Sequence, residues 1–116
     1  MSSVVDGVPI SHIVAYFFGG VFGINAAPHL VSAVLGRPFQ TPFARPPGKG
    51  LSSSLVNALW GFFNLAVAYL LVCQVGNFDI RVVVDVAPLG AGILFGSVFL
   101  ALTFGRLHGG NHPGRS

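Results

Sequence analysis

The sequence predicts an all-α integral membrane protein, in which three transmembrane helices form one small bundle. Two observations carry this prediction. Hydrophobic residues make up 53% of the 116-residue chain and charged residues only 8%, whereas soluble domains carry about 25% charged residues. The apolar residues also fall into three runs, each near the ~20 residues that a helix needs to cross the hydrocarbon core.

The three runs cover residues 10–35, 52–73 and 84–105. At 1.5 Å per residue the first would reach roughly 39 Å, longer than the ~30 Å core, so it should tilt or kink. We expect the kink at Pro28, because proline removes a backbone donor and frees the carbonyl four residues earlier. The serines at positions 52–54 suit the start of the second helix. Pro88 lies in the first turns of the third, where proline is tolerated.

Residues 37–51 connect the first two spans and contain four prolines. This density excludes a helix and favours extended or polyproline-like backbone. The glycine-rich, polar segment 107–116 is predicted to be a flexible cytoplasmic tail on a single transmembrane domain, residues 1–106.

Basic residues set the orientation. Five of them share one side of the three-span arrangement, namely Arg37, Arg45, Lys49, Arg106 and Arg115. The other side holds Asp6, Asp79 and Asp85 with Arg81. The positive-inside rule therefore places the basic side and the C-terminus in the cytoplasm and the N-terminus outside.

Because the first residues lack Lys and Arg, the first span should be retained rather than cleaved as a signal peptide. The same clustering beside apolar spans argues against a nucleic-acid partner, despite the net charge of +3.

Asn25, His29, Asn57 and Asn64 lie inside the otherwise apolar first two spans. Polar groups in hydrocarbon are costly and are retained for packing, ligand binding or passage. Asn25 and Asn64 fall near the midplane, and His29 and Asn57 both fall roughly 8–10 Å towards the cytoplasm at 1.5 Å per residue. Asn25 and His29 also share a helix face, being four residues apart. We therefore expect Asn25 to face Asn64 and His29 to face Asn57.

Each span also carries small residues at helical spacing, which allow helices to approach closely. The candidate packing positions are Gly19, Gly23, Gly61, Gly92 and Gly96. Such faces in a short chain predict a homo-oligomer or assembly with other membrane subunits.

Other patterns give weaker candidates. Arg37, Arg45 and Lys49 precede a helix start and suit anionic lipid headgroups among the membrane lipids, although capping and topology explain the same residues. His12 and Asp85 lie at similar depth, either as an ion pair or separately at the interface. No metal site is expected, since the tail residues His108 and His112 have no further ligands beside them.

One stretch resembles a family of known sequences. The segments N-A-A-P-H (25–29), G-R-P-F (36–39), P-F (42–43), P-P-G (46–48) and N-A-L-W-G-F-F-N (57–64) resemble a group of small, uncharacterised bacterial membrane proteins. The resemblance covers roughly the middle third of the chain. It implies a bacterial inner-membrane location and adds no catalytic residue.

Three functional hypotheses follow. The first is a small homo-oligomeric membrane protein that binds or passes a small polar solute, ion or proton at the Asn25/His29/Asn57/Asn64 cluster, with His29 as the titratable residue and the asparagines orienting the solute by hydrogen bonds. The second is an accessory subunit of a larger membrane complex, with the same residues joining helices by hydrogen bonds. The third is a membrane enzyme or a haem- or quinone-binding subunit using His29. Because no catalytic set can be assembled, the sequence predicts neither catalysis nor a cofactor.

Overall fold

The computed structural model describes residues 4, 5 and 7–114 and is mostly helical. Three helices dominate it: α1 (Ile10–Val34), α2 (Ser54–Tyr69) and α3 (Val83–His108). α2 continues as a π-helical turn, η1 (Leu70–Val75). Within the described part of the chain, α1, α2 with η1, and α3 are long and apolar enough to cross a membrane. The prediction of a small bundle of three apolar helices is thus confirmed in its helical content and spans.

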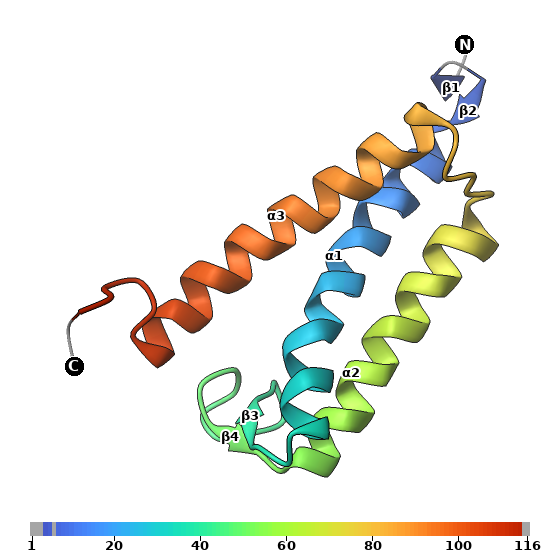
Figure 1. The fold of residues 1–116 in the computed structure, drawn as a ribbon. Coiled ribbons are helices and arrows are strands. Elements are labelled where there is room, and N and C mark those ends of the chain that lie inside the picture. Colours follow the sequence, from blue (N-terminus) through green and yellow to red (C-terminus); the bar gives the residue numbers. More distant parts are fainter. Residues whose placement is uncertain (1–3, 6, 115–116) are drawn as a thin grey trace.

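Two short antiparallel strand pairs lie at opposite ends of the bundle (Figure 1). β1 (Val4–Val5) pairs with β2 (Val8–Pro9) before α1. β3 (Phe39–Gln40) pairs with β4 (Leu51–Ser52) between α1 and α2. We call these ends the N-terminal end and the loop end. No helix forms in the proline-rich segment, as predicted, but its strands close it into a folded loop.

The observed helix boundaries differ slightly from the expected ones, for local reasons. α2 begins at Ser54 rather than at residue 52, because Ser52 is paired in β4. The Ser53 hydroxyl caps α2 by accepting a hydrogen bond from the Val56 amide at 3.2 Å. α3 extends three residues further than expected, and Gly109 ends it in the left-handed conformation at φ 81°. His108, expected in a flexible tail, therefore lies on the helix.

α1 is the central helix of the bundle. It packs against both α2 and α3, whereas α2 and α3 contact each other little. α3 diverges from the other two helices towards the loop end, where the β3–β4 segment lies beside it (Figure 1). α1 runs through Pro28 without interruption, and a kink there stays a prediction.

The closest helix contact lies between α1 and α3 near the N-terminal end. A Cβ at Gly92 would overlap the Phe17 backbone, and one at Gly20 would overlap the Leu89 backbone. Gly20 was not among the expected packing positions. Other expected glycines face side chains: Gly19 faces Val72, Gly61 faces Leu30 and Gly96 faces Ile24, while Gly23 has room for a methyl group.

Candidate functional site

The structure brings the midplane pair together. Asn25 on α1 donates a hydrogen bond from Nδ2 to Oδ1 of Asn64 on α2, at 2.9 Å. Asn64 is fully buried, and its own Nδ2 donates to the Trp60 carbonyl one turn earlier, at 2.8 Å. Both polar atoms of the Asn64 side chain are therefore occupied by the protein. The Oδ1 atom of Asn25 has no hydrogen-bond partner within residues 4–5 and 7–114.

The second pair is also present, and it is more tightly fixed. Nδ1 of His29 lies 2.7 Å from Oδ1 of Asn57. Nδ2 of Asn57 lies 3.0, 3.2 and 3.0 Å from the carbonyl oxygens of Phe39, Ser52 and Ser53. Asn57 thus ties α1 to the first turn of α2 and to both strands of the loop.

This network assigns the histidine tautomer. Carbonyl oxygens only accept hydrogen bonds, so the atom of Asn57 beside them must be the NH₂ group. Its Oδ1 must then accept from His29, which places the proton of a neutral imidazole on Nδ1. Nε2 of His29 is left as a hydrogen-bond acceptor. Nε2 has no hydrogen-bond partner among the described residues. Every fully buried side-chain nitrogen or oxygen of these residues does have a partner. Nε2 is therefore not fully buried, and a ligand can reach it.

A cavity of about 180 Å³ adjoins His29 and Asn25 at the loop end of the bundle. Gln40 and Thr41 from the loop line it as well, as does Thr103 from α3. A second cavity of about 140 Å³ contains the Asn25–Asn64 pair and shares Asn25 with the first. Polar residues of α1, α2 and the loop thus line two neighbouring cavities that share Asn25.

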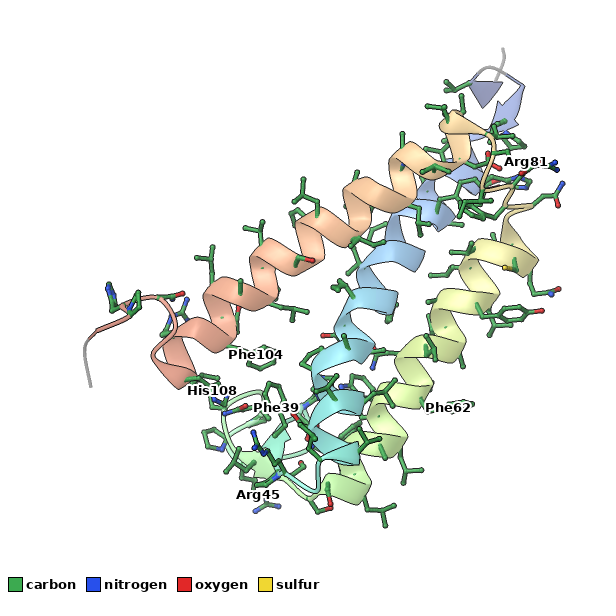
Figure 2. The ribbon with its side chains drawn as sticks, viewed as in Figure 1. Phe39, Arg45, Phe62, Arg81, Phe104 and His108 are labelled. Carbon is green, nitrogen blue, oxygen red and sulfur yellow. The ribbon has the colours of Figure 1, made fainter. Side chains whose placement is uncertain are left out.

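Aromatic rings form the rest of this site. The His29 ring packs edge-on against Phe39 and Phe104, with centroid distances of 5.6 and 6.4 Å. His108 stacks on Phe39 at 5.3 Å, and its Nε2 lies 2.9 Å from Oε1 of Gln40. Figure 2 shows Phe39, Phe104 and His108 gathered where the end of α3 meets the loop. This contact joins α3 to the loop where α3 diverges from α2.

Sequence reasoning did not find Gln40, Thr41 or the role of His108. Depth matching applies to helices, and these residues reach the site through the β3–β4 pairing and the extension of α3. The available signal was the pair of short segments around residues 39–40 and 51–52, which flank a proline- and glycine-rich turn.

The cavities do not continue as a polar route to the N-terminal end. Beyond Asn25, α1 and α3 meet at the Gly20–Leu89 and Phe17–Gly92 contacts, which leave no room for a side chain. The larger groove of about 450 Å³ between the helices there is lined mainly by glycine, alanine and aliphatic side chains. The polar site therefore ends near the middle of the bundle.

The remaining candidate residues lie apart from this site. Arg37, Arg45 and Lys49 are exposed at the loop end, and Figure 2 shows Arg45 and Arg81 at opposite ends of the molecule. Over the described ranges, no group of three or more His, Cys, Asp or Glu side chains is placed to hold a metal ion. His12 and Asp85 both line one cavity at the N-terminal end without forming an ion pair.

Together, the fold and the site define a small bundle of three membrane-length helices with a polar interior at one end. No protein-family model, curated protein or solved structure matches the chain.

Proposed function

We propose that this protein binds a small polar solute that donates hydrogen bonds, in the cavity beside His29. The observation that carries the proposal is the fixed His29 ring, whose Nδ1 is held by Asn57 and whose Nε2 is accessible. Asn25 Oδ1 supplies a second acceptor on the same cavity. A buried polar group without a partner is costly, so a solute or water that donates to both acceptors would stabilise this arrangement.

The cavity favours a neutral solute. No Asp, Glu, Lys or Arg lines it, so a full charge would lose hydration without gaining a charged partner. Its volume of about 180 Å³ is large enough for several waters or for one small organic molecule. In the alternative in which the site binds an ion, the ion is a proton, which Nε2 binds reversibly.

Binding from one side accounts for the geometry better than passage through a single chain. The polar residues reach the loop end but stop at the tight α1–α3 contact. Under our proposed topology the loop end, with Arg37, Arg45 and Lys49, faces the cytoplasm of a bacterial inner membrane and contacts anionic headgroups. The solute would then enter from the cytoplasm, and passage would require α3 to move away from α1.

Nitrogen NMR of the histidine ring tests this proposal. Protein labelled with ¹⁵N in histidine and held in detergent micelles would be titrated with acetamide and with glycerol, two neutral donors of suitable size. We expect a saturable shift of the His29 Nε2 resonance with at least one probe, weakened in Asn25→Leu. His12, at the other end of the bundle, is the internal control. Linear shifts that are equal for His29 and His12 would contradict the proposal.

A second candidate is an accessory subunit of a larger membrane complex with other subunits, without transport or catalytic activity of its own. The specific observation is that both polar atoms of the Asn57 and Asn64 side chains are hydrogen-bonded to the protein itself. In addition, α2 and α3 expose large side chains such as Phe62, Leu94 and Phe95. A native mass spectrum of protein purified from its own membrane distinguishes the two candidates. Stoichiometric foreign subunits would favour the accessory role, whereas identical copies with a small bound mass would favour solute binding.

A further inference from the structure

A separate cavity, of about 330 Å³, lies at the N-terminal end of the bundle, at the opposite end from the His29 site. The β1–β2 hairpin, the start of α1, the loop after η1 and the start of α3 all contribute to it. Its volume falls at the lower end of the range for small-molecule sites, about 300–1,000 Å³. Polar side chains line it, notably His12, Tyr16, Asn77, Asp79 and Asp85.

The feature that calls for a ligand is the Asp85 carboxylate. The residue is 4% exposed and lies in the first turn of α3, where the helix N-terminus favours negative charge. Oδ2 of Asp85 accepts a hydrogen bond from the Asp79 amide at 2.9 Å. The other carboxylate oxygen has no partner in the described part of the chain, and it is not fully enclosed. A buried carboxylate is stable only when charge or hydrogen bonds compensate it.

No basic side chain of the described residues neutralises Asp85. Arg81 pairs with Asp79 instead, at 3.3 Å between Nε and Oδ1, and its side chain is 86% exposed. The Arg81 backbone amide, followed by its guanidinium, donates to the Asp79 carboxyl and lowers the pKa of that group. Asp79 is therefore paired within its own turn, and Asp85 lines the cavity without a cationic side chain beside it. His12 is the one basic side chain among the described residues that line the cavity, and it forms no ion pair with Asp85.

The other walls suit a cation that carries N–H donors. The Tyr16 hydroxyl oxygen accepts from the Asn77 amide at 2.9 Å, and its second lone pair remains available. The Tyr16 ring is fixed by T-shaped contacts with the rings of His12 and Phe78. No three His, Cys, Asp or Glu side chains of the described residues are placed to hold a metal ion, which favours an organic cation over a divalent metal at this site.

We infer that this cavity binds a small organic ammonium ion, with Asp85 as its counter-ion and Tyr16 as an additional acceptor. The site is separate from the proposed solute site, and neither depends on the other. It would make the N-terminal end of the protein responsive to primary amines.

The test uses the full ¹⁵N-labelled chain in micelles, titrated with methylammonium chloride. The amides of Asn77 and Asp79 report directly, since they donate to Tyr16 and Asp85. We expect saturable shifts at both amides, with half-saturation at least about tenfold lower than for sodium or potassium chloride at equal ionic strength. Linear shifts, or equal half-saturation for the three cations, would overturn the inference.

Two charge-neutralising variants separate a specific site from a general field effect. Asp85→Asn keeps an oxygen that can accept from the Asp79 amide and should raise half-saturation about tenfold. Asp79→Asn removes the same charge from the carboxylate already paired with Arg81, and should change half-saturation less than about twofold. Equal weakening by both variants would overturn the inference. If Asp85→Asn fails to fold, the comparison of cations on the unmodified chain decides alone.

Discussion

Nδ1 of His29 lies 2.7 Å from Oδ1 of Asn57, and this contact joins α1 to α2 at the loop end. Because Nδ2 of Asn57 faces three backbone carbonyls, the amide cannot rotate without breaking several hydrogen bonds. The histidine ring therefore has one orientation and, when neutral, one tautomer. The asparagine thus has a structural role, and it fixes the orientation and the tautomer of the histidine.

Replacing Asn57 by alanine should destabilise the protein more than replacing Asn25. Asn57→Ala removes the side-chain amide, so the backbone carbonyls beside it lose their donor. It also leaves His29 Nδ1 buried without an acceptor, which costs about 1–3 kcal/mol. Asn25→Ala removes one hydrogen bond between membrane helices, worth about 0.6 kcal/mol on average. Equilibrium unfolding in mixed micelles measures both losses. A larger effect at Asn25 would contradict the network described here.

The tautomer gives a spectroscopic prediction. In the unmodified protein, the ¹⁵N spectrum of His29 should show a protonated Nδ1 and an unprotonated Nε2 at alkaline pH. Asn57→Leu removes the acceptor, so Nε2–H should become the main form, as it usually is for a solvated histidine. His12 provides the comparison within the same sample. An unchanged His29 tautomer in the Asn57→Leu variant would show that another group orients the ring.

The spans and both polar pairs could be predicted from the sequence, because they depend on quantities that are local to a helix. Rise per residue fixes the depth of Asn25 or Asn64, and the four-residue spacing fixes the face that carries Asn25 and His29. Two antiparallel helices of similar length then bring residues of equal depth together. The functional role assigned to these pairs stays a prediction.

The rest of the site depends on tertiary contacts that periodicity does not encode. Gln40 reaches the cavity because β3 pairs with β4. His108 contacts Gln40 and Phe39 of the loop because α3 continues as far as this residue. Gly20 resembles its neighbour Gly19 in the sequence, and only the crossing of α1 and α3 decides that it must lack a side chain.

The α1–α3 contact predicts opposite effects for two glycines on the same helix. A methyl group at Gly92 would overlap the Phe17 backbone, whereas one at Gly90 would meet no atom within 4 Å. Gly92→Ala should therefore destabilise the bundle by about 1–3 kcal/mol. Gly90→Ala should be neutral or stabilise it by up to about 1 kcal/mol, since alanine is the better helix former. Thermal unfolding in one detergent compares them, and equal effects would place the helix contact elsewhere.

Cysteine labelling tests the proposed topology at the two ends of the bundle. Cys73 is the single cysteine, so a Cys73→Ser background leaves the chain free of thiols. Lys49→Cys in the loop and Ile80→Cys after η1 then introduce exposed thiols at opposite ends. The segment with Lys49 also carries Arg37 and Arg45, and positive charge is retained on the cytoplasmic side. A membrane-impermeant maleimide should therefore label position 80 in intact cells and position 49 only after permeabilisation. The reverse pattern would place the His29 cavity on the outer side and require its solute to enter from there.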